Sequence, residues 1–150
     1  MQWTPNVTVA AIIQQDDRFL MVEEMSKGRQ VYNQPAGHLE ANETLVEAVI
    51  REVLEETAWH FTPESVTGIY RMHVDTADTT YLRICFSGGV HGHEPDRELD
   101  SGIIQALWLS RQKLKSERNY CRSPLVLQCI DDFLSGQHYP LEILHDLGHV

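Results

Sequence analysis

The sequence has few cysteines and no long hydrophobic run. Its three cysteines, Cys85, Cys121 and Cys129, stand apart and form no CxxC pair. This spacing favours reduced structural thiols over a disulfide framework or a zinc cage. No stretch approaches the roughly 18 apolar residues of a membrane span, and the opening MQWTPNVTVA lacks the basic and apolar regions of a secretory signal. We therefore expect a cytoplasmic protein without a membrane partner.

Basic residues are also scarce. The chain has 12 lysines and arginines against 22 aspartates and glutamates, which gives a net charge of -10. Proteins that bind nucleic acid polymers normally present a basic face, so this charge argues against such a partner. A small phosphorylated ligand is still compatible with it, provided that a metal ion or a few arginines offset the negative field at one site.

The length of the chain limits its organisation. With 150 residues it can bury one sizeable core but is too short for two ordinary domains, so we expect one domain spanning 1–150. A loop is expected around 27–34, and the tail from 137 onward shows no clear pattern. β-branched runs, turn residues and helical spacing predict strands at 7–13, 18–24, 66–74, 79–90 and 103–109, and helices at 44–57 and 123–136.

The first predicted helix carries an unusual concentration of acid. Its apolar stripe, suited to packing on a sheet, consists of Val46, Val49, Ile50, Val53 and Thr57. Glu52, Glu55 and Glu56 occupy the adjacent arc of about 100°, at the edge of the core. Partly buried carboxylates about 5.5 Å apart repel each other by roughly 3 kcal/mol at an effective dielectric near 20. A cation is therefore expected beside them.

A solvated acidic face is the commonest explanation of a glutamate-rich helix. Such faces normally interleave lysine or arginine at every fourth position. Between Glu43 and Thr57, however, there are five glutamates and a single base, Arg51. Oxygen ligands at this density suit a hard divalent ion, Mg²⁺ or Mn²⁺, and offer nothing soft for zinc. We therefore favour a metal site.

The spacing of these residues resembles the Nudix box, G-x5-E-x7-R-E-U-x-E-E-x-G-U, in which U is apolar. The matching positions, within residues 37–59, are Gly37, Glu43, Arg51, Glu52, Val53, Glu55, Glu56 and Trp59. Only the last glycine differs, because Ala58 takes its place. Alanine resists a left-handed helix end by about 1 kcal/mol. It removes no ligand or charge, so we do not expect Ala58 to inactivate the protein.

The resemblance implies a fold and a reaction. The fold is α/β (α+β), with a mixed β-sheet sandwiched between helices, and the reaction is hydrolysis of a nucleoside diphosphate linked to another moiety X. By position, Glu52 and Glu56 correspond to direct metal ligands. Glu55 corresponds to a ligand that binds directly or through water, and the carbonyl of Gly37 to a further ligand.

The same resemblance assigns roles around the metal. Glu43 and Arg51 would orient the acids, and one to three Mg²⁺ ions would activate a water for in-line attack on phosphorus. Glu52 is the first candidate for the catalytic base and Glu55 the second. Outside the box the candidates are the acids of the 94–100 loop, for which solvation is the simpler interpretation: Glu94, Glu98 and Asp100.

A resemblance to the NudJ-type bacterial phosphatase subgroup rests on three further sequence segments, QPAGHLEANETLVEA, RSPLV and YPLE. This subgroup implies thiamine-related pyrimidine pyrophosphates and nucleoside di- and triphosphates as substrates. Strand alternation places Arg71 and His73 on one face, and Tyr81 and Arg83 on one face of the neighbouring strand. Arg71, Tyr81 and Arg83 are thus candidates for substrate binding, although a surface ion pair is the simpler role for Arg83.

Several functions fit these observations. The first is an active hydrolase of a small-molecule pyrophosphate, working as a monomer or homodimer. The others are a Nudix pyrophosphohydrolase for a different substrate, a non-catalytic nucleotide-sensing module, and a Ca²⁺-stabilised structural domain. A sensing module would not need Glu52, Glu55 and Glu56 together, and the chain has no EF-hand pattern. The intact glutamates therefore favour the enzyme.

Overall fold

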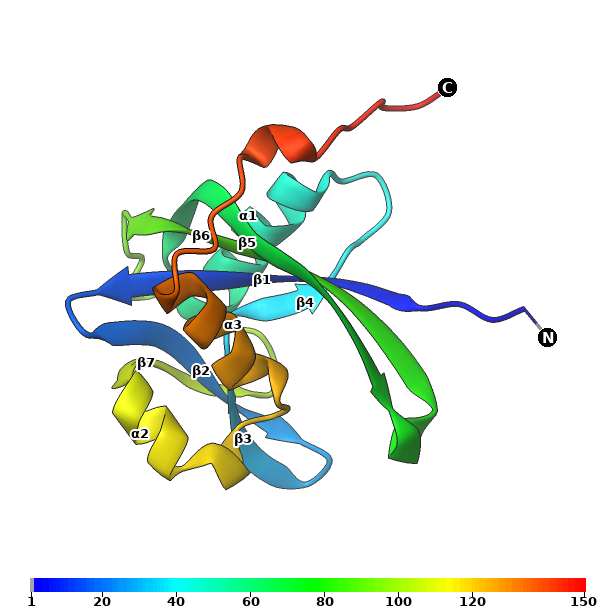
Figure 1. Cartoon of the computed structure of the whole chain (residues 1–150). Helices are drawn as coiled ribbons and strands as arrows, with labels where there is room; N and C mark the ends of the chain where they lie inside the picture. The colour runs from blue at the N-terminus through cyan, green and yellow to red at the C-terminus, as the bar shows by residue number, and fades with distance from the viewer. Residues whose placement is uncertain (1) are drawn as a thin grey trace.

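The computed structural model describes residues 2–150, arranged as strands and helices (Figure 1). The strands are β1 (Asn6–Gln15), β2 (Arg18–Ser26), β3 (Arg29–Asn33), β4 (Ala36–His38), β5 (His60–Val74), β6 (Thr79–His91) and β7 (Ile103–Ser110). The helices are α1 (Leu45–Thr57), α2 (Arg111–Ser116) and α3 (Leu125–Leu134), with 3-10 turns at Asp75–Ala77, Arg118–Tyr120 and Leu141–Ile143. In this described part of the chain, no helix has the length and apolarity needed to cross a membrane.

The strands form one mixed sheet. Its main path runs β3-β2-β1-β6-β5, while β4 pairs with β1 and β7 pairs with β2. β1 and β6 are parallel, and the other neighbours are antiparallel. Because β1 lies at the centre, its residues 9–13 are buried on both faces, which explains why VAAII is apolar without alternation.

Helices cover both faces of the sheet (Figure 1). On one face α1 packs through Val49 and Val53 against Val9 of β1. On the other face Val126 of α3 and Leu114 of α2 belong to a second core cluster. Burial of each valine contributes about 1.5–3 kcal/mol relative to exposure. The predicted architecture, a mixed sheet between helices, is confirmed.

Helix α1 begins and ends close to its predicted limits. Thr44 forms a capping box, because its side chain accepts from the Glu47 N–H and the Glu47 carboxylate accepts from the Thr44 N–H. At the other end Ala58 adopts the left-handed conformation, with φ 63° and ψ 15°, and donates its N–H to the Leu54 carbonyl at 3.0 Å. Alanine therefore keeps the helix end that glycine would favour, at a cost of roughly 1 kcal/mol.

One local prediction is wrong, one helix was missed and one strand begins earlier than predicted. Strand β3 lies in the segment 27–34 that was expected to be a loop, because pairing with β2 stabilises it despite its turn-like composition. Helix α2 was not predicted, since six residues are too few to show a helical period. Strand β5 begins at His60, ahead of the predicted 66, and accommodates irregular pairing near Pro63.

Candidate functional site

Three acidic side chains of α1 lie where the helix meets the core. Glu52 and Glu56 are one turn apart and only 8% and 7% exposed, while Glu55 is half-buried. They lie beside the stripe of Val49 and Val53, as their spacing predicted. Nearly buried carboxylates are costly without a cation or hydrogen-bond donors, so their surroundings decide what they can do.

Glu56 receives one backbone donor. Its Oε1 accepts the N–H of Ala36 at 2.9 Å. Burial raises the pKa of Glu56 to about 9, and although the Ala36 N–H opposes this shift, the charge of Glu52 adds to it. Without a metal ion, this carboxyl group is therefore protonated at neutral pH.

The two other acids are shifted in the same direction. Burial raises the pKa of Glu52 to about 6, against the stabilising hydrogen bond from Arg51. Burial and the nearby charge of Asp100 raise the pKa of Glu55. Metal binding requires deprotonated carboxylates, so the metal affinity of this group should increase with pH.

Arg51 is the centre of the hydrogen-bond network around these acids. Its guanidinium donates to Glu43 at 2.7 and 2.9 Å, to Glu52 at 2.8 Å and to Glu55 at 3.2 Å. It also donates to the His38 carbonyl at 3.0 Å, which ties α1 to β4. One planar fork thus limits the rotamers of three carboxylates, which is the orienting geometry expected for Arg51 and Glu43.

Gly37 allows Glu52 to approach the backbone of β4. A Cβ atom on residue 37 would lie 2.2 Å from the carboxyl carbon and from Oε1 of Glu52. Real atoms cannot approach so closely, so any side chain at this position would displace the Glu52 carboxylate. The glycine is therefore required by a close approach and not by an unusual φ angle.

The loop before β7 adds a fourth acid. Glu52, Glu55 and Asp100 each offer a carboxylate oxygen, and these atoms lie within 4.8 Å of one another. The Asp100 N–H donates to the Glu55 carbonyl at 3.0 Å, which holds the loop against α1. Such a group of oxygen donors fits a hard divalent cation and could hold one.

The other loop acids are placed differently. Glu94 contacts His60 at 2.5 Å and Arg97 at 3.5 Å, and Glu98 is exposed. Neither belongs to the group around Glu52. Of the three loop acids proposed as alternative bases, the structure thus brings only Asp100 to the helix acids.

Known proteins were compared with this chain. A model of the NUDIX domain matches residues 3–127, which is most of the chain. The chain belongs to the Nudix family. Phosphatase NudJ from Escherichia coli K12 is 42% identical over 146 residues, which cover 96% of this chain and 93% of that protein. The predicted resemblance to the NudJ-type subgroup, and with it a Nudix hydrolase acting on phosphoric anhydride bonds, is confirmed.

Solved structures agree with this assignment. A NUDIX hydrolase from Nitrosomonas europaea has a TM-score of 0.94 and 51% sequence identity, covering 95% of this chain and 97% of that one. A MutT protein from Methanosarcina mazei Go1 has a TM-score of 0.72 at 22% identity, covering 91% and 99%; it shares the fold. The predicted Nudix fold is therefore confirmed.

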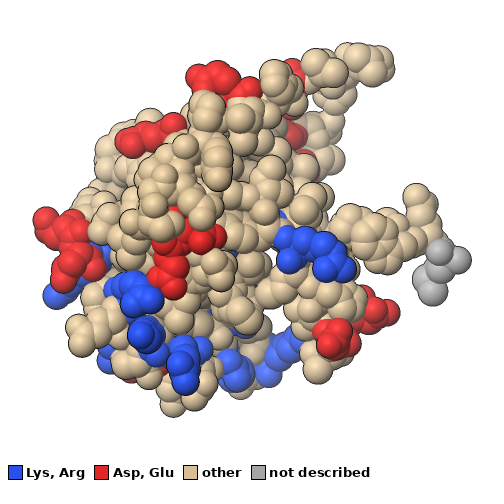
Figure 2. Space-filling model, viewed as in Figure 1, with Lys and Arg blue, Asp and Glu red and all other residues tan. Residues whose placement is uncertain are grey.

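A cavity of about 730 Å³ adjoins the Nudix glutamates. Glu52, Glu56 and Gly37 line it on one side. The hairpin of β5 and β6 contributes Met72, Val74 and Tyr81, and the start of α3 contributes Leu125. In the space-filling view the surface is hollowed between the body of the molecule and the protruding hairpin (Figure 2). The acids thus border a space large enough for a small organic substrate.

The three predicted substrate residues do not lie together. Tyr81 and Arg83 line the cavity, but Arg71 does not. In the register of the β5–β6 pair Tyr81 lies opposite Met72, whereas Arg71 lies opposite Leu82 and is exposed. The structure therefore brings Tyr81 and Arg83 to the cavity and leaves Arg71 on the opposite face of the hairpin, because pairing partners share a face and residues at odd offsets do not.

Arg83 is not a surface residue, as the simpler interpretation had assumed. It is 6% exposed and forms no surface ion pair; its neighbours are described below. Glu24 of β2 was not singled out from the sequence, yet it is buried, lines the cavity and pairs with Arg122 at 2.5 Å. Its only signal was an acid just after the apolar run of β2, next to the half-buried Glu23.

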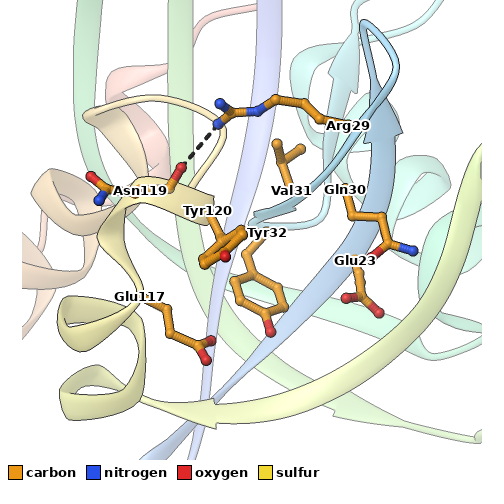
Figure 3. Close-up of a pocket in the computed structure, with 8 residues that line it drawn as sticks. All are labelled: Glu23, Arg29, Gln30, Val31, Tyr32, Glu117, Asn119 and Tyr120. Carbon is orange, nitrogen blue, oxygen red and sulfur yellow. Dashed lines mark hydrogen bonds between the residues drawn. The ribbon is translucent and has the colours of Figure 1, made fainter.

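A second cavity of about 570 Å³ lies beside β3 (Figure 3). Tyr32 and Tyr120 line it together with Glu23 and Glu117, and Arg29, which also lines it, donates to the Asn119 carbonyl at 3.0 Å. Arg29 also lines the first cavity, but none of the Nudix glutamates borders the second. The chemistry is therefore expected in the first.

We expect Arg51→Lys to lower kcat/KM by about 10- to 100-fold, because lysine keeps the charge but cannot orient three carboxylates at once. Stability should change little, with a Tm decrease below about 4 °C, since the network is partly exposed. Steady-state kinetics and thermal unfolding measure the two effects. Arg111→Lys, at an ion pair with Asp131 remote from the box, is the matched control. Equal losses in both variants would contradict an orienting role for Arg51.

Proposed function

We propose that this Nudix protein is a Mg²⁺-dependent hydrolase of small pyrophosphate compounds, with Mn²⁺ as an alternative ion. The proposed substrates are thiamine-related pyrimidine pyrophosphates and nucleoside di- and triphosphates. The observation that carries the proposal is that Glu52 and Glu56, both nearly buried, border a large cavity beside Gly37. The 42% identity to a phosphatase over nearly the whole chain supports the same class of reaction.

The metal ligands in this proposal are Glu52, Glu55, Glu56 and the Gly37 carbonyl. A bound divalent cation would neutralise the diphosphate and lower the pKa of a coordinated water. The donor set supports this, because it consists of hard oxygen atoms, with Asp100 available as a further one. Arg51 and Glu43 would hold the carboxylates in place before the ion binds.

Glu52 is the proposed catalytic base, and Glu55 is the second candidate. In the absence of a metal ion, burial raises the pKa of Glu52 to about 6. Its carboxylate is fixed by Arg51 at 2.8 Å and confined by Gly37. The proton of the attacking water would pass to this oxygen while the phosphoric anhydride bond breaks.

The proposal extends to the cellular setting. We propose a cytoplasmic enzyme, monomeric or homodimeric, whose partners are small molecules and include neither nucleic acid polymers nor membranes. The net charge of -10 supports the exclusion of polyanions.

A substrate screen tests this function. Thiamine, pyrimidine and nucleoside pyrophosphates are incubated with Mg²⁺, Mn²⁺ or EDTA, and products formed in ¹⁸O-labelled water are identified by mass spectrometry. We expect metal-dependent release of phosphate or a monophosphate, with the label marking the phosphorus attacked. Turnover of only other nucleoside diphosphate derivatives would identify a different Nudix pyrophosphohydrolase. Binding without any turnover would identify a nucleotide-sensing module.

A further inference from the structure

Arg83 is a buried arginine whose donors are only partly used. It lies on β6 and is 6% exposed. Nη1 donates to Gln34 Oε1 at 2.9 Å and approaches Cys129 Sγ at 3.8 Å, and Nη2 donates to Asn33 Oδ1 at 3.3 Å. Nε is buried and has no partner in residues 2–150. Since arginine has five N–H donors, Nε–H and one hydrogen of Nη2 lack an acceptor.

The acceptors of Arg83 are two neutral amides and a thiol. All three cysteines of the chain are buried and free. A hydrogen bond from Cys85 and the charge of Arg83 lower the pKa of Cys129 to about 7. Even as a thiolate, however, Cys129 would accept only from Nη1, so Nε–H and one hydrogen of Nη2 would still lack an acceptor. Unused donors on a buried charged group are costly. Nε is covered by protein atoms, so a ligand in the cavity that Arg83 lines would meet the guanidinium at Nη2.

Asn33 adds a further donor at the same place. It is 5% exposed, and its Oδ1 is occupied by Arg83. Its amide nitrogen, which carries two hydrogens, is therefore the only free end of this side chain. Asn33 and Arg83 both line the cavity. This end of the cavity thus offers donors from two adjacent side chains.

The sheet register places these donors away from the metal site. Thr8 of β1 is the partner of Arg83 on one side and of His38 on the other. Neighbouring strands lie about 4.8 Å apart, so the Cα atoms of Arg83 and His38 are about 10 Å apart. A diphosphate bound next to Gly37 would therefore direct its attached group across β1 toward Arg83.

The cavity that Arg83 lines has further walls that suit a planar ring. Met72 and Val74 of β5, Tyr81 of β6 and Leu125 of α3 line the same cavity. Apolar and aromatic walls with a few fixed polar groups are typical of sites that bind the ring of a ligand. A phosphate group would gain little from such walls.

We propose that Arg83 and Asn33 determine the preference among nucleotide substrates by binding the base through two adjacent hydrogen-bond acceptors. The proposal rests on the proposed function, since it concerns the group attached to the diphosphate. Cytosine offers such an edge at N3 and O2, and guanine at N7 and O6. Uracil places N3–H between its two carbonyl oxygens, and adenine places its amino group beside N1 and N7, so neither base offers two adjacent acceptors. Cytosine and guanine nucleotides should therefore bind better than uracil and adenine nucleotides.

Binding of nucleoside monophosphates tests the proposal without hydrolysis, because they contain no phosphoric anhydride bond. Dissociation constants for CMP, GMP, UMP, AMP and ribose 5-phosphate are measured by calorimetric titration in Mg²⁺. We expect CMP and GMP to bind about 10- to 100-fold more tightly than UMP and AMP. Arg83→Met should bring all four to within about threefold of one another. Asn33→Ala should reduce the same preference by a smaller factor.

Controls separate the possible causes. Arg18→Met, at an exposed position outside both cavities, should keep the base preference, and thermal unfolding verifies that each variant is folded. If Arg83→Met weakened ribose 5-phosphate as much as CMP, Arg83 would bind phosphate and the proposal would be overturned. Equal binding of all four nucleotides by the wild type would overturn it too. Turnover of the diphosphates is measured separately. If the proposed hydrolase function failed, the base preference in binding could therefore still be interpreted.

Discussion

Glu56→Gln is expected to lower kcat by about 10³-fold. A metal ligand contributes several kcal/mol to the stabilisation of charge in the transition state. Glutamine preserves the shape and can still accept the Ala36 N–H through its carbonyl oxygen, so packing should be maintained. The loss would therefore report the missing negative charge at residue 56. Single-turnover kinetics with saturating Mg²⁺ measure it.

The same variant should be more stable than the wild type in the absence of metal at alkaline pH. Burial raises the pKa of Glu56 from 4.5 to about 9. Between these values the folded protein retains a proton that the unfolded chain releases, so wild-type stability falls as the pH rises through this range. Because glutamine does not titrate, Glu56→Gln should not lose stability in this way as the pH rises. We expect the Tm of Glu56→Gln in EDTA to exceed that of the wild type by about 3 °C or more at pH 8.5.

Metal ions should reverse this difference in Tm, so that the wild type becomes more stable than Glu56→Gln. Because metal binding stabilises the folded state, Mg²⁺ should raise the Tm of the wild type and have little effect on Glu56→Gln. Glu47→Gln is the matched control, since Glu47 is exposed on the same helix and glutamine still completes the capping box. Glu56 would be excluded as a metal ligand if Glu56→Gln kept the wild-type turnover. It would also be excluded if Mg²⁺ raised the Tm of Glu56→Gln as much as that of Glu47→Gln.

Gly37→Ala should lower kcat/KM by about 100-fold or more while the protein stays folded. The added Cβ would lie 2.2 Å from the Glu52 carboxylate. The atoms that it meets are the end of a flexible side chain, so Glu52 can turn away without moving the backbone. A displacement of about 1 Å at a reacting group can cost about 10²-fold in rate. The change in Tm should stay below about 4 °C, because the φ angle of Gly37 is not in the left-handed region.

Gly89→Ala is the matched control for this substitution. Gly89 also lies in a strand, but a Cβ there would meet only Glu64 Oε1 at 3.8 Å, an ordinary contact. Activity should therefore be kept. Gly37→Ala and Glu52→Gln combined should lose little more activity than either alone, because both remove the same carboxylate from its position. Additive losses would show that Gly37 acts independently of Glu52.

The parts of the fold that the sequence predicts depend on local signals. Thr44 and Glu47 form the capping box that their spacing of three residues indicates. The pairing of Gln14 with Phe19 confirms the first predicted hairpin. Strand β3 and helix α2 were missed because a strand is stabilised by its partner, and a short helix by its packing, more than by their own residues.

The exposed position of Arg71 has a similar cause. Alternation along a strand shows which residues share a face, but it does not show how two strands are aligned. The register Met72 opposite Tyr81 decides which side chains of β5 enter the cavity. A shift of one residue would have exchanged Arg71 for Met72, so the position of Arg71 depends on one offset that the sequence does not give.

By itself the sequence determines the acidic part of the site. A helix has 3.6 residues per turn whatever surrounds it, so Glu52, Glu55 and Glu56 share an arc beside Val49 and Val53 once the segment is helical. The Nudix box then identifies the family from residues within one short segment.

Only the tertiary structure decides what surrounds those acids. Asp100 reaches Glu55 across more than 40 residues of chain, and Arg83 meets Asn33 across 50. These contacts depend on loop packing and strand register, which no local pattern encodes. Burial, which raises the pKa of Glu56 to about 9, is likewise a property of the packed core. The order of the residues thus indicates which groups are candidates for binding a metal, and the fold decides their proton affinity and what lies opposite them.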